Sequence, residues 1–196
     1  MRVIYVKPTS DQKRFIVGVD NGEEKQRYNI SSALYGTLSL STGVEIDEET
    51  ITTLENEDNA YNCMRSALGF LAYADNNRKK LYAKLIKRGY SRDMAKFAVE
   101  RCVSLGYINE YEQTKRIILK EADKLYGRAY IFKKLIAGGY SASMVNRAFD
   151  ELIQDGEVDF NDNLKTLLYK KGATSEEERK KLMHKYGYLI RDTYDD

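Results

Sequence analysis

Short apolar runs separated by turn residues mark the first part of the chain. Residues 3–6 and 14–19 are rich in valine, isoleucine and aromatic residues, which is typical of strands. Asn21 and Gly22 follow the second run, and this pair favours a tight turn because both residue types tolerate positive φ. Residues 26–30 then return as a third run. The pattern predicts a β-hairpin or small meander, which is too small to be stable alone.

The pattern then changes to that of helices. Residues 43–57 are acidic and begin a helix, for which Asp47 is well placed as the N-cap because its carboxylate can accept a backbone N–H. From Asn59 onward apolar residues recur at helical spacing, and no strand pattern competes. The single proline, Pro8, lies before this region, so no proline interrupts the predicted helices.

An internal repeat organises the helical part. Residues 81–94 align with residues 131–144, fifty positions later. Six residues of the first copy recur identically in the second: Leu85, Ile86, Gly89, Tyr90, Ser91 and Met94. In each copy the glycine can end a helix in the left-handed conformation, and the serine two positions later can cap the next helix. A shorter copy lies at residues 183–188, preceded by Ser175 and Glu178 at the spacing of a capping box.

The repeat predicts the fold class. We expect a mainly α protein, in which tandem three-helix repeats form an elongated, curved array next to a small N-terminal β-hairpin or meander. The predicted parts are an N-terminal β-rich extension at 1–57, a first repeat at 58–109, a second repeat at 110–160 and a shortened third repeat at 161–196.

Composition indicates a globular protein. The 196 residues include 32 Lys and Arg against 30 Asp and Glu, and 42% are hydrophobic, which separates the chain from disordered proteins. No stretch approaches the roughly 18 apolar residues that a membrane span needs. The N-terminus lacks the apolar core of a signal peptide. We therefore expect a cytoplasmic protein that does not contact a membrane.

The charges are unevenly distributed along the chain. Residues 1–59 carry a net charge of −5, residues 78–148 carry +11 and residues 149–196 carry −4. A block this basic is typical of a surface that binds phosphates or an acidic protein groove. The alternative is a set of lysines that only solvate the helices, but that does not explain the shortage of acidic residues in the block.

Few residues offer catalytic or metal-binding chemistry. Cys63 and Cys102 form no CxxC pair and are too few for a disulfide scaffold, so both are expected to be small buried hydrophobic residues. His184 is the single histidine and is expected on the surface, which argues against a zinc site or a histidine-based triad. We predict no catalytic residue, no metal site and no cofactor.

Two basic stripes are the candidate binding residues. In one predicted helix, Lys80, Lys84 and Lys87 lie opposite an apolar stripe that contains Leu81 and Leu85. The helix after Asn109 carries a second stripe, which lies roughly opposite its apolar positions and consists of Arg116, Lys120 and Lys124. Three like charges at i, i+4 and i+8 repel one another, which favours a surface that binds a polyanion over one that only faces water.

The tyrosines divide into two groups. Tyr126 and Tyr130, beside Arg128, are candidates for a surface on which bases stack, with packing left open as the alternative. Four others occupy positions typical of packing: Tyr82, Tyr90, Tyr107 and Tyr140.

The tandem units resemble the RecX family, the bacterial regulators of the RecA recombinase. The first unit carries the resemblance at Arg78, Leu81, Lys84, Leu85, Gly89, Tyr90 and residues 105–110, and the second at Gly127, Arg128, Ile131, Leu135, Gly139 and Tyr140. The β-type N-terminal extension is similar to that of RecX proteins from Firmicutes. The chain departs from the family pattern at Lys80, Glu110, Gln113 and Thr114.

The resemblance implies a non-enzymatic regulator with a role in DNA recombination and repair. Proteins of this family bind along the groove of the RecA–ssDNA filament, block its growth, and inhibit RecA ATPase, strand exchange and co-protease activity. The expected partners are therefore the RecA filament and single-stranded DNA, bound by a monomer. From the stripes and their neighbours we predict these contact residues: Arg78, Lys80, Lys84, Lys87, Arg116, Lys120, Lys124, Arg128 and Lys134. The alternative is a basic nucleic-acid-binding module that acts without RecA.

Overall fold

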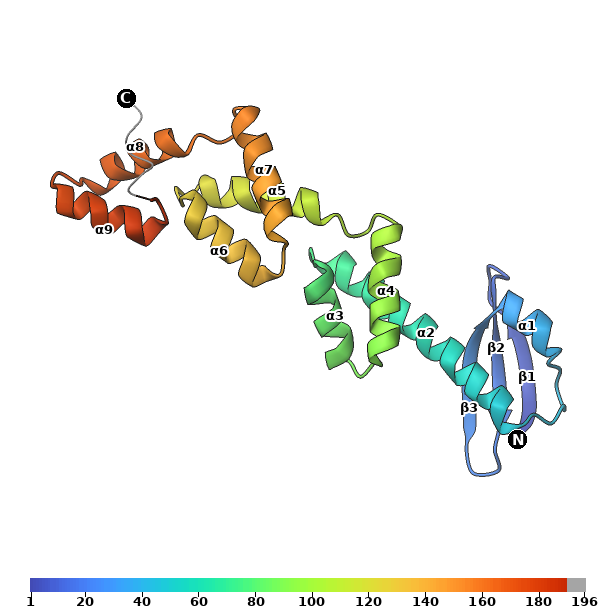
Figure 1. Cartoon of the computed structure of the whole chain (residues 1–196). Coiled ribbons are helices and arrows are strands. Elements are labelled where there is room, and N and C mark those ends of the chain that lie inside the picture. Colours follow the sequence, from blue (N-terminus) through green and yellow to red (C-terminus); the bar gives the residue numbers. More distant parts are fainter. Residues whose placement is uncertain (190–196) are drawn as a thin grey trace. The chain divides into compact units, whose positions relative to one another are not determined.

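The structure is a computed structural model that describes residues 1–189 (Figure 1). Within these residues the strands are β1 (Arg2–Pro8), β2 (Arg14–Asp20) and β3 (Lys25–Ser31). The helices are α1 (Ser32–Leu38), α2 (Glu48–Tyr73), α3 (Arg78–Lys87), α4 (Arg92–Ser104), α5 (Glu110–Ala122), α6 (Arg128–Gly138), α7 (Ala142–Gln154), α8 (Phe160–Lys171) and α9 (Glu176–Tyr186). The predicted fold class, helical with a small N-terminal sheet, is confirmed. The elongation and curvature of the array stay predictions.

The N-terminal sheet is an antiparallel meander with the strand order β1-β2-β3. Val17 pairs with Val6 on one side and with Tyr28 on the other. The predicted turn after the second strand is present, and Gly22 adopts a φ of 90° in it. The short helix α1 was not predicted; its start is capped by Ser31, whose side chain accepts a hydrogen bond from the Leu34 N–H.

Helix α2 covers the sheet and continues beyond it. Asp47 is its N-cap and accepts a hydrogen bond from the Thr50 N–H, as predicted. Its first turns pack Ile51 and Leu54 into the core of the sheet, while its later turns contact α4. The helix therefore runs without a break through residue 57, where the sequence suggested the end of the N-terminal extension.

Carboxylates of α2 accept hydrogen bonds from backbone N–H groups along the outer edge of β3. Asp58 Oδ1 accepts a hydrogen bond from the Asn29 N–H at 2.8 Å, and Glu57 Oε1 accepts one from the Ser31 N–H at 3.1 Å. An edge strand otherwise exposes such donors, which can pair with another chain. These bonds join the sheet to the helix that begins the first repeat.

The chain forms two compact units. Within the described residues, unit 1 contains residues 1–74 and 81–104, and unit 2 contains residues 75–80 and 105–189. In unit 1 the sheet, α2 and α4 pack together, and in unit 2 α7 packs against α5 and α6.

The helix boundaries predicted from the repeat are confirmed. Gly89 and Gly139 have φ values of 98° and 97°, in the left-handed region where a side chain is unfavourable. Ser91 and Ser141 then cap α4 and α7 by accepting hydrogen bonds from the backbone N–H groups three positions on. The third copy begins with the predicted capping box of Ser175 and Glu178 on α9. Any further helix of that copy would fall on residues 190–196, outside the described residues.

One predicted packing position is wrong. Tyr140 is buried, but Tyr107 is 56% exposed, because the neighbouring Ile108 takes the buried position after Gly106. The second repeat has the same arrangement, with Glu157 at the exposed position and Val158 buried.

In unit 2 the end of one helix repeatedly docks on the start of another. At the end of α9, the carbonyl of Tyr186 accepts a hydrogen bond from the Gly127 N–H at 2.7 Å, and that of Gly187 accepts one from the Ala129 N–H at 3.1 Å. At the end of α6, the Gly138 carbonyl accepts a hydrogen bond from the Asn77 side-chain amide at 2.9 Å. The helices α6 and α9 thus each end against residues at the start of an earlier helix, α3 and α6 respectively.

The close approach at Gly187 leads to a stability prediction. A Cβ built on Gly187 would lie 2.4 Å from the Tyr130 backbone nitrogen, whereas one on Gly172, another left-handed helix end, meets nothing within 4 Å. We expect Gly172→Ala to lower the free energy of unfolding by about 1 kcal/mol, the ordinary cost of the left-handed conformation. Gly187→Ala should cost about 3 kcal/mol, because overlap with backbone is added. Urea denaturation of both variants measures the difference, and equal losses would contradict the docking described above.

Candidate interaction surface

The basic stripe predicted on α3 is exposed at two of its three positions. Lys80 and Lys87 are exposed, and neither makes an ion pair with a described residue. Lys84 is half-buried, since its side chain crosses the ring of Phe70 with Nζ 5.4 Å from the ring centroid. This stripe therefore carries positive charge that no carboxylate in the described chain neutralises.

The stripe predicted on α5 is exposed but largely neutralised. Arg116 lies 2.8 Å from Asp75, and Lys124 lies 2.9 Å from Glu121. Lys120 makes no ion pair with any residue that the structure describes. Of this stripe, only Lys120 offers a charge that a partner could bind without breaking an internal contact.

Glu121 is the centre of a buried charge cluster that the sequence did not reveal. Its side chain is only 4% exposed, and its two carboxylate oxygens lie 2.9 Å from Lys124 Nζ and 2.9 Å from Lys134 Nζ. Burial raises the pKa of Glu121, but the hydrogen bonds and charges of the two lysines outweigh burial and lower it overall. Lys124 and Lys134, both predicted contact residues, therefore neutralise a buried carboxylate inside unit 2.

The remaining predicted residues are also partnered. Arg78 pairs with Glu110 at 3.6 Å. Arg128 pairs with Asp150 at 3.2 Å, and its guanidinium lies 5.0 Å from the Phe149 ring centroid. Five of the nine predicted contact residues thus have an acidic partner among the described residues: Arg78, Arg116, Lys124, Arg128 and Lys134.

The first repeat differs, because many of its basic side chains have no acidic partner. The following are exposed and make no ion pair within the described chain: Arg65, Lys87, Arg88, Arg92, Lys96 and Arg101. Sequence reasoning missed most of them because it looked for stripes on single helices. The sequence did contain a signal for these unpaired residues, because Asp93 is the single acidic residue between positions 76 and 99.

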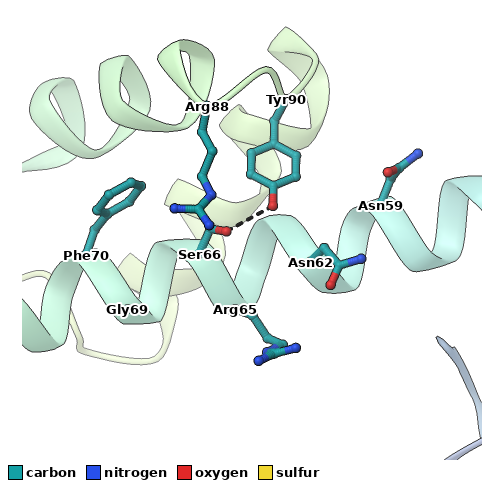
Figure 2. Close-up of a pocket in the computed structure, with 8 residues that line it drawn as sticks. All are labelled: Asn59, Asn62, Arg65, Ser66, Gly69, Phe70, Arg88 and Tyr90. Carbon is teal, nitrogen blue, oxygen red and sulfur yellow. Dashed lines mark hydrogen bonds between the residues drawn. The ribbon is translucent and has the colours of Figure 1, made fainter.

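A pocket of about 620 Å³ in unit 1 adjoins these residues (Figure 2). Its floor is the face of α2 that carries Asn62, Ser66 and Gly69, and Tyr90 stands on its wall with its hydroxyl 2.9 Å from Ser66 Oγ. Its other lining residues are Asn59, Arg65, Phe70 and Arg88, so no acidic side chain lines it.

A smaller pocket of about 130 Å³ continues toward the sheet. It shares Asn62 and Arg65 with the larger pocket and is also lined by Arg27, Asn29 and Asp58. The Asp58 carboxylate is engaged there by the Asn29 N–H and by the Asn62 side-chain amide at 2.9 Å. Both pockets are therefore lined in part by α2.

The two tyrosines that could serve either for base stacking or for packing, Tyr126 and Tyr130, are packed. The rings of Tyr126 and Tyr130 stack with centroids 4.1 Å apart, and Tyr186 stacks on Tyr126 at 5.4 Å. All three lie at the contact between α6 and α9, where they are half-buried rather than open to a base.

The described residues include no metal-ligand cluster, and both cysteines are buried. Residues 1–189 contain no cluster of three or more His, Cys, Asp or Glu side chains that could hold a metal ion. Cys63 and Cys102 are buried as predicted, and burial raises the pKa of Cys63 to about 11, which keeps the thiol protonated. Among the described helices, none is both long and apolar enough to cross a membrane.

Comparison with known proteins finds RecX proteins among those that this chain is similar to. The chain matches no protein-family model. It is 24% identical over 152 residues to the regulatory protein RecX of Clostridium tetani (strain Massachusetts / E88), covering 78% of this chain and 70% of that protein. A crystal structure of regulatory protein RecX superposes with a TM-score of 0.74 at 16% identity, covering 97% of this chain and 95% of the other.

The resemblance to the RecX family is confirmed. RecX from Lactobacillus salivarius also superposes, with a TM-score of 0.57 at 16% identity over 68% of this chain and 91% of that one. The helical repeats and the small N-terminal sheet together make up a RecX fold.

The α5 stripe gives a stability test with an internal control. Lys124→Glu would place a second carboxylate beside the buried Glu121, so we expect it to lower the free energy of unfolding by about 2–3 kcal/mol. Lys120→Glu makes the same charge change at an exposed, unpaired position and should alter stability by less than about 0.5 kcal/mol. Thermal and urea unfolding compare the two, and a neutral Lys124→Glu would show that the Glu121 cluster contributes nothing.

The same cluster predicts a pH dependence. Because the pKa of Glu121 is lowered in the folded protein, its ion pairs contribute fully above its ordinary value of 4.5, and the contribution is lost as the pH falls through the folded value. Glu121→Gln should therefore destabilise the protein most near neutral pH, and the difference from the wild type should shrink below about pH 4. Urea unfolding at a series of pH values tests this, and a difference that does not change with pH would contradict it.

Proposed function

We propose that this RecX-like protein is a regulator of RecA. It binds the RecA–ssDNA filament in its groove and inhibits filament growth, and with it ATPase, strand exchange and co-protease activity. The observation that carries the proposal is the RecX fold over 97% of the chain, joined to sequence similarity with a regulatory RecX protein. In this proposal the protein acts in the cytoplasm as a monomer and takes part in the repair and recombination of DNA, including the SOS response.

The proposed activity is binding rather than catalysis. A regulator of this kind needs a surface whose charge complements DNA phosphates or acidic residues of RecA. Among the predicted contact residues, Lys80, Lys87 and Lys120 supply such charge without an internal ion pair. The paired residues would have to exchange an existing carboxylate for the partner, which makes their net contribution smaller.

A direct experiment measures the ssDNA-stimulated ATPase of RecA with substoichiometric amounts of this protein. We expect inhibition by the wild type. Changing Lys80, Lys87 and Lys120 together to Gln should raise the concentration for half-inhibition about tenfold, since exposed pairs contribute roughly 0.5 kcal/mol each.

The matched control changes three exposed lysines of α8 to Gln: Lys165, Lys170 and Lys171. This removes the same charge from the acidic end of the chain, so inhibition should stay near that of the wild type. Equal loss in both variants would mean that overall charge matters and the named residues do not. No inhibition by the wild type would refute the proposed function.

The second candidate function is nucleic-acid binding without RecA. The acid-free pocket in unit 1 favours it, because that chemistry needs no protein partner. The two candidates separate in one comparison: a RecA regulator lowers the RecA ATPase at less than one molecule per RecA, whereas a simple binding module does so only at amounts that cover the DNA.

A further inference from the structure

The pocket on α2 holds positive charge in an arrangement that is unfavourable without an anion. Lys84 of α3 and Arg88, which directly follows that helix, are four residues apart, and both approach the Phe70 ring, with the Lys84 ammonium 5.4 Å and the Arg88 guanidinium carbon 5.9 Å from its centroid. Like charges at this spacing repel. Neither makes an ion pair within residues 1–189, so the repulsion is not relieved inside the protein.

Neutral hydrogen-bonding groups complete the surroundings of these cations. Figure 2 shows Arg88 reaching from α3 toward Ser66, while Arg65 leaves the opposite side of the α2 ribbon. The amide side chains of Asn59 and Asn62 line the same pocket further along α2. Guanidinium groups bind phosphate oxygens in pairs of parallel hydrogen bonds, and amides and hydroxyls add single bonds to phosphate or sugar.

The second repeat shows that this arrangement is specific to the first. Fifty positions on, Arg88 is replaced by Gly138, and Lys84 by Lys134. Lys134 is neutralised by the buried Glu121, which stands where α2 has Leu71. The second repeat therefore has the carboxylate and lacks the arginine, whereas the first has the cations and lacks the carboxylate.

The shape of the site favours a single strand over a duplex. Duplex DNA is read by a helix or ribbon that protrudes into its groove, whereas a single strand lies in a basic channel that follows its backbone. The two pockets share Asn62 and Arg65, and their lining residues on α2 run from Asp58 to Phe70, a rise of about 18 Å at 1.5 Å per residue, which is long enough for several nucleotides.

We propose that this α2 groove, lined by Asn59, Asn62, Arg65, Ser66, Phe70, Arg88 and Tyr90, binds the phosphate backbone of single-stranded nucleic acid. Arg88 and Arg65 take the phosphates, and Phe70 holds Arg88 in place. The inference deepens the proposed function and rests on it for the identity of the partner as DNA. It assigns the strand to the face of α2 in unit 1 and not to the α5 stripe.

The test measures binding of a fluorescent oligothymidylate of about 12 nucleotides by anisotropy, between about 50 and 200 mM salt. The double variant Arg65→Gln, Arg88→Gln should bind at least tenfold more weakly at the lower salt. Its slope of log affinity against log salt should fall by about 1.4, since each lost phosphate contact removes about 0.7. Arg88→Lys keeps the charge but not the paired hydrogen bonds, so its affinity for the oligothymidylate should lie between those of the wild type and Arg88→Gln.

The matched control is Lys96→Gln, Arg101→Gln on α4, which removes the same charge from exposed, unpaired residues of the same unit that do not line the groove. It should bind as the wild type does. Equal losses in the two double variants would overturn the proposal in favour of diffuse charge. Tighter binding of polyglutamate than of the oligonucleotide would overturn it in favour of an acidic protein segment, and equal binding of a duplex would overturn the assignment to a single strand.

The RecA ATPase assay on the same variants separates this inference from the proposed function. If the wild type does not inhibit RecA while the groove variant still loses the oligonucleotide, the proposed function fails and the groove assignment stands. If the wild type inhibits RecA and the groove variant binds the oligonucleotide as tightly as the wild type, the groove assignment alone fails. Arg65 and Arg88 are both exposed, so thermal melting should show that the variants are folded.

Discussion

The second unit depends on backbone contacts between the end of one helix and the start of another. The final carbonyl groups of α9 accept the first N–H groups of α6, so groups that each helix would leave without a partner satisfy one another. The opposite partial charges of the two helix ends favour the same contact. Glycine is required at both sides, since a Cβ on Gly127 or Gly187 would lie 2.4 Å from the opposing backbone. Main-chain contacts therefore fix the end of α9 against the start of α6.

Local features of the fold were predictable because they depend on a few neighbouring residues. The glycines that end α3 and α6 and the serines that cap the helices after them follow from the sequence alone, as does the capping box of α9. Exposure of Arg116 and Lys120 followed from helical periodicity. The ion-pair partners of the basic residues did not follow from periodicity. Lys134 pairs with Glu121, thirteen positions away in the sequence, and Arg116 pairs with Asp75, forty-one positions away. Ion pairing depends on how the helices pack against one another, and the periodicity of a single helix carries no information about that packing.

This difference in pairing changes how the basic block is understood. Counted along the chain, residues 78–109 carry a net charge of +7 and residues 110–148 carry +4. In the structure, the acids Asp75, Glu110, Glu121 and Asp150 neutralise much of the second repeat, while the first keeps its charge facing solvent and a pocket. The two copies of the repeat thus differ in how their charges are paired, and one reason is that the first has leucine at position 71 where the second has glutamate at position 121.

Helix α2 also sets a rule for how related chains can vary in length. Its first turns are fixed to the sheet by Asp58 and Glu57, and its later turns are fixed to α4 around Cys63 and Ala67. A single residue inserted between these two contacts would turn one relative to the other by about 100° and move it by about 1.5 Å. Changes of about seven residues restore the phase of the helix to within about 20°. Relatives that keep both contacts should therefore differ in the length of this helix by multiples of about seven residues, which is two helical turns.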